Sequence, residues 1–400
     1  MAEATPVRSG GSRASHLRLV NGGGRPTARS PGGATDRTVA TLLLATTSLV
    51  VLGLVMVLSA SSVRAYEDYG SSFLFFGRQL AYAVVGATAF LLTARMRYTA
   101  WRRLCVPLLL ISVGMLVMVL LPGVGTVAGG SARWIQLGPV TIQPSEPAKI
   151  AVIAFAAALL SRRWRRIGAL RELTVPLAPV MGVVAGLILL QPDMGTAVIV
   201  VATVFIVLFA AGARAKHLLV GSAGLMTVGL GLMYIEGYRW ARVISFVNPW
   251  SDPQGSGYQT IQSMIALASG GPLGVGLGAS RQKWSYVPNA HTDFIFSIIG
   301  EELGLIGGLA VLALFAALLF AGARIALRAT DAFGRFLAVG ITGWFGVQAV
   351  VNLGAVTGLL PITGVPLPFV SFGGSSLVVS MAAVGILVSV ARGARRARRG

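Results

Sequence analysis

The chain alternates between long apolar runs and short polar connections. A helix needs about 20 apolar residues to cross the roughly 30 Å hydrocarbon layer of a bilayer, and the runs are close to that length. The pattern therefore predicts an all-α polytopic membrane protein with about ten transmembrane helices. The expected spans lie at about 39–60, 76–94, 104–122, 147–162, 174–190, 196–212, 217–236, 293–322, 336–357 and 377–391.

The composition supports this fold class. Hydrophobic residues make up 55% of the chain and charged residues only 12%. The single cysteine, Cys105, lies inside an apolar run, so no disulfide framework is expected.

Basic residues are unevenly distributed among the connections. The chain has 33 Lys and Arg against 13 Asp and Glu, a formal net charge of +20. Most of the Lys and Arg lie on the two tails and on alternate connections, which is the pattern of the positive-inside rule. Both termini are therefore predicted to be cytoplasmic, and the excess charge indicates membrane topology and not a nucleic-acid partner.

Three segments follow from these patterns. Residues 1–37, rich in Gly, Arg, Ser, Thr and Pro, are predicted to be a disordered basic cytoplasmic tail. Residues 38–391 would form the ten-span membrane domain, and residues 392–400 a second basic cytoplasmic tail.

The connections expected on the outer side carry the recognisable local structure. Residues 123–146 predict a small hairpin, with strands of Arg-Trp-Ile-Gln-Leu and Val-Thr-Ile-Gln around a Gly138-Pro139 turn. The large connection 237–290, between spans seven and eight, contains an amphipathic stretch at 258–269 and a Gly-rich stretch at 270–278. The Gly-rich stretch lacks the strand and the Gly-Lys-Ser/Thr ending of a phosphate-binding loop, so close backbone packing is the favoured interpretation.

Asp293 lies where this connection becomes span eight. One interpretation is a capping acid, which a helix N-terminus stabilises by about 0.3–1 kcal/mol. The other is a general base that takes a proton from a sugar hydroxyl, while cations hold a phosphate leaving group. We favour the second because bases gather on the outer face: Arg133, Lys149, Arg239, Arg242, Arg281 and Lys283.

Other ionisable residues lie near this position or deeper in the membrane. Glu146 and Lys149 are three apart, so they share a helix face and can pair, either as local helix support or as part of the site with Lys149 facing Asp293. Glu301 and Glu302 are expected deeper in span eight, bonded to a neighbouring helix or a water-filled cavity, or else to substrate. Intramembrane ionisable residues mark functional sites by default.

The last outer connection, 358–376, is irregular backbone at a membrane boundary. Such backbone persists only where protein or water satisfies its polar groups, so a re-entrant segment that lines a cavity is predicted. Its residues Ser371, Gly373, Gly374 and Ser375 are the expected cavity residues.

His291 is the one histidine expected on the outer face. Because no second His or Cys stands at metal-ligand spacing, no protein metal site is expected, and no cofactor is assigned. A divalent cation, Mg²⁺ or Mn²⁺, held by substrate phosphates remains compatible with the sequence.

These motifs resemble one family, the FtsW/RodA/SpoVE (SEDS) proteins of cell shape, elongation, division and sporulation. The resemblance covers 38–391 in order, and the basic N-terminal tail and Ser280-Arg-Gln-Lys-Trp284 are most similar to its cell-division branch. It rests on 352–376, His291-Thr-Asp-Phe-Ile-Phe, Gly300-Glu-Glu-Leu-Gly, Arg133-Trp134-Ile, Gln143-Pro-Ser-Glu-Pro-Ala-Lys149, Gln191-Pro-Asp-Met-Gly-Thr196 and Asp252-Pro-Gln-Gly-Ser-Gly-Tyr-Gln259.

The resemblance implies a peptidoglycan glycosyltransferase that polymerises lipid II at the outer face of the bacterial cytoplasmic membrane, at the division septum. It further implies a class B penicillin-binding protein and other divisome membrane proteins as partners. Asp293 matches the family's catalytic aspartate, and Arg133, Trp134, Glu146 and Lys149 match residues that serve the same cavity. Asn289 stands where many relatives have Glu, which argues against a two-carboxylate mechanism.

Two rival functions stay open. Ten spans, broken backbone and buried Glu301 and Glu302 also suit a transporter that flips lipid II. A non-catalytic scaffold that only recruits the transpeptidase is the other alternative.

Overall fold

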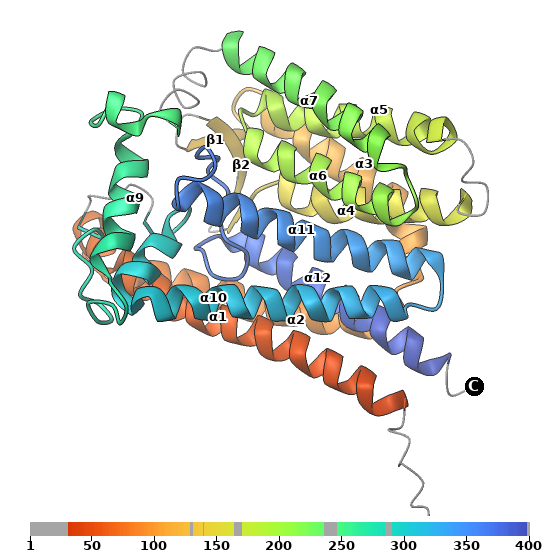
Figure 1. The fold of residues 1–400 in the computed structure, drawn as a ribbon, viewed down its shortest axis with the longest axis horizontal. Helices are drawn as coiled ribbons and strands as arrows, with labels where there is room; N and C mark the ends of the chain where they lie inside the picture. The colour runs from red at the N-terminus through yellow and green to blue at the C-terminus, as the bar shows by residue number, and fades with distance from the viewer. Residues whose placement is uncertain are drawn as a thin grey trace, which may run out of the picture.

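The structure of this chain is a computed structural model, and it describes residues 31–128, 131–138, 140–163, 170–235, 246–284 and 290–397. Most of these residues are helical (Figure 1). The long helices are α1 (Pro31–Tyr69), α2 (Leu74–Arg95), α3 (Ala100–Leu120), α4 (Ser145–Arg163), α5 (Leu170–Leu190), α6 (Met194–Ala210), α7 (Ala215–Ile235), α10 (Ile295–Arg328), α11 (Ala332–Val356) and α12 (Gly374–Arg396). The shorter elements are β1 (Gly125–Ala128), β2 (Ser131–Leu137), β3 (Val140–Ile142), η2 (Pro249–Ser251) and α9 (Tyr258–Ser269).

Each predicted span falls on one of the long helices. Within the described residues, 6 helices (α1, α2, α3, α10, α11 and α12) are long and apolar enough to cross a membrane, while the apolar parts of α5 and α6 are shorter. The chain is therefore a polytopic α-helical membrane protein, and the exact number of spans stays a prediction.

The first helix extends beyond the apolar run that predicts it. α1 begins at Pro31 and not near Val39, so it includes residues assigned from composition to the disordered tail. Two contacts at this end join α1 to other helices: Arg395 of α12 pairs with Asp36 at 2.7 Å, and Arg328 of α10 donates to Thr38 at 3.0 Å. Such tertiary contacts are not visible in a hydropathy pattern.

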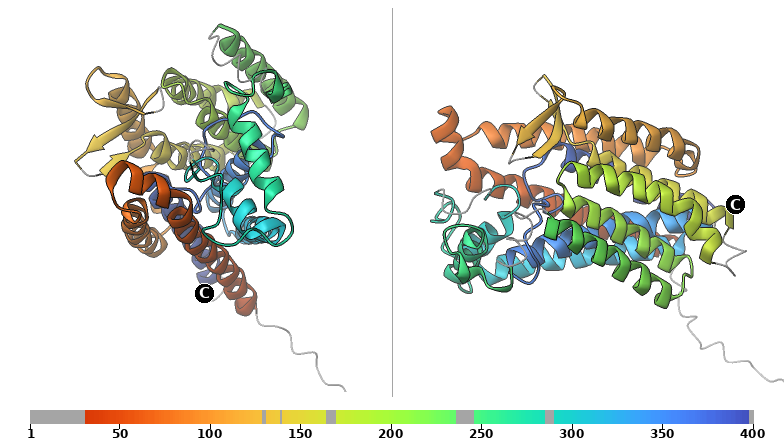
Figure 2. Two further views of the ribbon diagram at one scale, coloured as in Figure 1. Left: turned by 90° about the vertical axis from the view of Figure 1, so that its left-hand side faces the viewer. Right: turned by 90° about the horizontal axis from the view of Figure 1, so that it is seen from above.

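The long helices run roughly side by side along the long axis of the molecule (Figure 1). α12 packs on α2, α1 on α10, α10 on α11, and α3 on α4. The strands and α9 lie at one end of the bundle, whereas the start of α1 and the C-terminus lie at the other (Figures 1 and 2). The two ends of the bundle are thus built from different elements.

The predicted hairpin is present, with one strand more than expected. β2 and β3 are antiparallel, with Gln136 opposite Thr141, and Gly138 between them has φ of 61°. β1 adds to the other side of β2, which gives a three-stranded sheet in the order β1-β2-β3. The four-residue β1 lacks an apolar alternation that would have marked it in the sequence.

Candidate functional site

Asp293 lies in a turn directly before α10, one residue ahead of the N-cap residue Phe294. The residue is half-buried, and its main-chain carbonyl accepts a hydrogen bond of 2.8 Å from the side-chain amide of Asn352 on α11. Asn352 also donates to the carbonyl of Val365 at 2.7 Å. One amide side chain therefore joins the Asp293 turn to residues 358–373, the part of the predicted re-entrant segment that precedes α12 and is called the re-entrant segment below.

Further hydrogen bonds hold the neighbours of Asp293 against the same segment. The Ser371 hydroxyl donates to the carbonyl of Thr292 at 2.6 Å and accepts from the amide of Leu367 at 2.8 Å. The amide of Phe372 donates to the carbonyl of His291 at 2.9 Å. The backbone just before Asp293 is thus held by the re-entrant segment.

The predicted cavity residues after Ser371 lie against α2 and the hairpin. The amide of Gly373 donates to Gln79 of α2 at 3.3 Å, and the Ser375 hydroxyl accepts from the amide of Gln143 at 3.2 Å. Gly374 lies so close to the ring of Tyr82 that a Cβ there would collide with it. These residues anchor the end of the re-entrant segment where α12 begins.

His291 is buried between two aromatic rings, Phe75 at 4.9 Å and Phe372 at 5.6 Å between centroids. Burial lowers the pKa of His291 to about 4, and the positive charge of Arg64 acts in the same direction. At neutral pH the imidazole is therefore uncharged, and the contacts of this side chain are those of an aromatic packing residue.

Glu146 and Lys149 form the ion pair that their spacing predicts, at 2.9 Å and with both side chains 2% exposed. The Lys149 ammonium also donates to Gln348 of α11 at 3.0 Å and lies 4.7 Å from the centroid of the Trp344 ring. Gln348 in turn donates to the carbonyl of Pro366 at 2.8 Å. A continuous set of polar contacts therefore links α4 through α11 to the segment that holds Asp293.

Arg133 on β2 contacts the turn between α5 and α6. Its guanidinium donates to the carbonyls of Gln191 and Pro192, and it lies 3.7 Å from the carboxylate of Asp193. Asp193 caps α6 by accepting from the amide of Thr196 at 3.2 Å. These contacts fix the hairpin on the bundle, and the half-buried Trp134 next to Arg133 pairs with β1.

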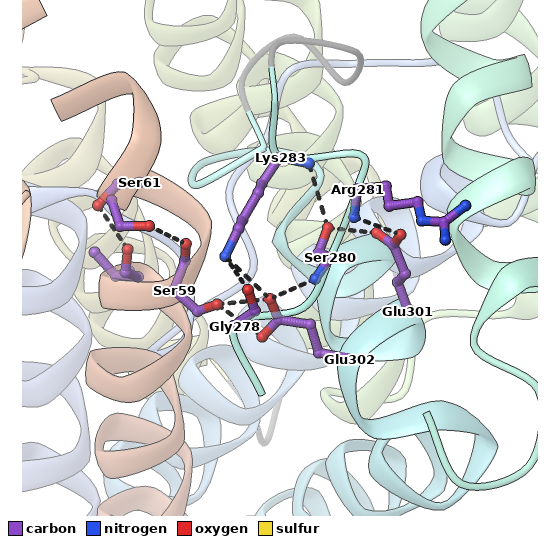
Figure 3. A network of polar contacts seen from close by, with 10 residues as sticks. Ser59, Ser61, Gly278, Ser280, Arg281, Lys283, Glu301 and Glu302 are labelled. Atoms are coloured by element: carbon purple, nitrogen blue, oxygen red, sulfur yellow. Dashed lines mark hydrogen bonds and ion pairs between the residues drawn. The ribbon is translucent and has the colours of Figure 1, made fainter. Parts of the chain in front are cut away.

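Glu301 and Glu302 belong to a second polar network, 2% and 1% exposed, around a break in α10 (Figure 3). The Ser59 hydroxyl of α1 lies 2.6 Å and 2.8 Å from the two carboxylate oxygens of Glu302. The Ser280 hydroxyl and the Arg281 amide donate to Glu301, the latter at 2.9 Å. The contact with a neighbouring helix expected for these acids is present for Glu302.

The helix of span eight is interrupted at Gly304, which the sequence did not predict. This residue has φ of 67° and ψ of −165°, outside any helix. The Gly-rich stretch lies in the break: the amides of Val275 and Gly276 donate to the carbonyls of Glu301 and Glu302, while Leu305 and Ile306 donate to the carbonyls of Gly271 and Pro272. The close backbone packing predicted for this stretch is therefore its packing into α10.

The remaining predicted cations differ in their surroundings. Lys283 is 8% exposed, and its ammonium donates to the carbonyl of Gly278 and lies 3.9 Å from Glu302. The side chain of Arg281 is exposed. Arg239 and Arg242 lie outside the described residues.

The site thus consists of two groups. Asp293, His291, Ser371 and the Glu146–Lys149 pair belong to the group around the re-entrant segment; Arg281, Lys283, Glu301 and Glu302 belong to the group around the α10 break. Within the described ranges no cluster of three or more metal-ligating side chains occurs.

Sequence reasoning missed the roles of the amide, hydroxyl and carboxylate side chains that hold these groups in place: Ser59, Gln79, Gln143, Asp193, Gln348 and Asn352. The sequence feature that could have identified them is a polar residue within or next to an apolar span. Such a residue is expected to form a hydrogen bond, but the sequence does not show with which partner.

Comparison with known proteins shows which family this chain belongs to. A family model described as FTSW_RODA_SPOVE, cell cycle protein, matches residues 40–396. Stage V sporulation protein E of Bacillus subtilis (strain 168) is 45% identical over 358 residues, which cover 88% of this chain and 97% of that protein. A protein of Trichlorobacter lovleyi named probable peptidoglycan glycosyltransferase FtsW is 46% identical over 356 residues, which cover 89% of this chain and 93% of that protein.

A solved structure agrees with these relatives. The chain superimposes with a TM-score of 0.74 and 32% identity on a chain described under "Structural coordination of polymerization and crosslinking by a peptidoglycan synthase complex", covering 88% of this chain and 97% of that one. The helical bundle, the Asp293 turn and the re-entrant segment thus occur in a chain that belongs to the FtsW/RodA/SpoVE family of polytopic membrane proteins of the cytoplasmic membrane.

Proposed function

We propose that this protein is a peptidoglycan glycosyltransferase that polymerises lipid II into glycan strands at the outer face of the cytoplasmic membrane during division. The observation that carries the proposal is the Asp293 turn, an acid at the strand-bearing end of the bundle. Its backbone is held at residue 293 by Asn352 of α11 and at residues 291 and 292 by the re-entrant segment. Relatives named probable peptidoglycan glycosyltransferase FtsW support the reaction class.

In this reaction a hydroxyl of the acceptor sugar attacks the anomeric carbon of the donor. Asp293 accepts the hydroxyl proton as general base, the new glycosidic bond forms, and the bond to undecaprenyl pyrophosphate breaks. The pyrophosphate leaves with the bonding electron pair, so its negative charge is stabilised by cations nearby. Fixing the backbone around Asp293 supports this role because a general base works only within hydrogen-bond reach of its proton.

A role in binding the substrate or its pyrophosphate is proposed for Arg133, Trp134, Glu146, Lys149, Arg239, Arg242, Arg281, Lys283 and His291, and a phosphate-bound divalent cation is compatible with it. The burial and the contacts of these side chains show which of them a ligand could reach most easily. Among the described cations of this set, Arg281 is the most accessible, because it is exposed whereas Arg133 is half-buried and Lys149 and Lys283 are buried. Lys149 and Lys283 are buried on protein partners, so each would have to leave a contact to bind phosphate.

The proposed partners are a class B penicillin-binding protein and other divisome membrane proteins, with both termini cytoplasmic and the protein at the septum. A similar solved chain belongs to a complex described as coordinating polymerization and crosslinking. That description supports a transpeptidase partner for this chain.

The test is polymerisation of purified lipid II by the detergent-solubilised protein, with and without its cognate transpeptidase. Asp293→Asn keeps the shape and removes the base, so glycan formation should fall by about 10²–10⁴-fold, the usual contribution of general base catalysis. Asp68→Asn is the matched control, because this acid is about half exposed and pairs only with Arg64 among the described residues. Unchanged glycan chains from the Asp293 variant would remove the assignment.

The break in α10 favours one alternative, a lipid II flippase, because broken helices are common at transporter sites. Transfer of labelled lipid II across vesicles that hold the purified protein, in the absence of glycan synthesis, would support it. A scaffold function would be supported if Asp293→Ala rescued division in depleted cells.

A further inference from the structure

The second end of the bundle, remote from Asp293, contains a cavity of about 250 Å³. It lies where the end of α2, the connection to α3, the connection between α10 and α11, and the end of α12 meet. The cavity is lined by Ala94, Arg95, Met96, Arg97, Tyr98, Thr99, Thr330, Ser389, Arg392, Gly393, Arg396 and Ala397. Four of these side chains are arginines, all of them exposed, and none is an acid.

In the described part of the chain, the four arginines lack the side-chain partners that other arginines at this end, such as Arg395 and Arg328, have. Arg395 pairs with Asp36, and Arg328 donates to Thr38. Within the part of the chain that the structure describes, Arg95, Arg97, Arg392 and Arg396 have neither an ion pair nor a side-chain hydrogen bond. Asp331, the nearest acid by sequence to the lining residue Thr330, accepts from Tyr98 at 2.8 Å and caps α11.

We propose that this cavity binds a phosphate-bearing anion, the headgroup of an anionic phospholipid. A guanidinium group binds two phosphate oxygens through a pair of parallel hydrogen bonds. Four guanidinium groups around one cavity repel one another, and a bound anion would reduce this repulsion. At about 250 Å³ the cavity falls just below the 300–1,000 Å³ typical of sites for drug-sized molecules, so it fits a headgroup whose acyl chains stay outside. Basic pockets between spans are known places for such headgroups.

Helix geometry offers the competing explanation. Arg95 and Arg396 lie in the last turns of α2 and α12, where a positive charge stabilises the negative end of the helix dipole. That role concerns stability alone and does not depend on which lipid surrounds the protein. Lipid dependence therefore separates the two explanations.

The experiment compares the full chain in nanodiscs of phosphatidylcholine with nanodiscs that also contain phosphatidylglycerol. Thermal unfolding and native mass spectrometry report the stabilisation and the lipid that stays bound. Arg95→Gln combined with Arg392→Gln should lower the apparent affinity for phosphatidylglycerol by about thirtyfold. This factor assumes that each of the two arginines makes the usual contribution of a basic residue near a charged membrane surface. The matched control is Arg102→Gln with Arg103→Gln, which removes the same charge from exposed positions of α3 outside the cavity.

A third arm adds inorganic phosphate to phosphatidylcholine nanodiscs at constant ionic strength. Stabilisation by phosphatidylglycerol alone, lost in the cavity variant and kept in the control, supports a lipid headgroup. Stabilisation by inorganic phosphate as well, with the same loss in the cavity variant, supports the same site for a soluble phosphate. If the cavity variant and the control respond alike to both additions, the site is disproved and the arginines only stabilise their helices.

Discussion

Replacing Gly304 with alanine tests whether the break in α10 depends on the backbone of the inserted Gly-rich stretch. Gly304 has φ of 67° and ψ of −165°, a combination that is essentially restricted to glycine. A Cβ built on it would lie 2.6 Å from the carbonyl oxygen of Pro272 and would also collide with the amide of Gly274. Because both contacts are backbone atoms, no side-chain rotation relieves them.

The expected loss of stability has two parts. A non-glycine residue in this backbone conformation costs about 1–3 kcal/mol. Displacing the inserted stretch also breaks the four hydrogen bonds of 2.9 to 3.3 Å between residues 271–276 and 301–306. At a net value near 1 kcal/mol for each bond, these add up to about 4 kcal/mol if the stretch leaves completely. Gly304→Ala should therefore destabilise the protein by at least ~1 kcal/mol through backbone strain, and by more for each of these hydrogen bonds that is lost.

The assay is equilibrium unfolding in detergent, followed by tryptophan fluorescence, with limited proteolysis of the connection before α10 as a second measure. The matched control is Gly114→Ala in α3, where an added Cβ meets nothing within 4 Å. Alanine in a helix interior is about 0.5–1 kcal/mol more favourable than glycine, so the control should be neutral or stabilising. Equal stability of the two variants, or protease resistance unchanged in Gly304→Ala, would refute the dependence of the break on the inserted stretch.

Two further predictions concern the other group of buried residues. His291 has a folded-state pKa of about 4, below the unfolded value of 6.5, so its contribution to stability is complete above pH 6.5 and is lost as pH falls toward 4, by up to ~3 kcal/mol. His291→Phe should flatten that part of the stability–pH curve, measured by unfolding midpoints between pH 4 and 7, and an unchanged slope would contradict it. Lys149→Met leaves Glu146 buried without a cation and should destabilise by about 3–5 kcal/mol, whereas the double variant with Glu146→Gln should recover much of the loss. No recovery in the double variant would show that the ion pair is not the cause.

Sequence patterns predicted the helices well because a span must be apolar over most of its length, whatever its neighbours are. The amphipathic stretch at 258–269 became α9 over the same residues, and the hairpin around Gly138 is also present. Local propensity and turn chemistry are sufficient for such elements. The helix start at Pro31 was missed because its contacts lie on α10 and α12, far away in sequence.

The break at Gly304 was missed for a related reason. An isolated glycine in an apolar run is common in membrane helices and says nothing of a break by itself. What makes the break possible is the stretch at 270–278, some 30 residues earlier, whose own glycines let its backbone approach the open carbonyls of Glu301 and Glu302. Neither segment predicts the other without the three-dimensional structure.

The need to satisfy irregular backbone within the protein helps to decide which buried polar residues take part in chemistry. A bilayer offers no water to irregular backbone, so each such segment must find partners within the protein. Polar side chains of the spans supply such partners for two irregular segments in the described part of the chain. Gln79, Gln348 and Asn352 bond residues 365–373, and Glu301 bonds Ser280 and Arg281. Polar residues within spans are usually interpreted as functional, yet these have main-chain partners that account for their burial. Glu301 and Glu302 therefore fit the structural interpretation better than direct substrate contact, and the chemistry is better sought at Asp293.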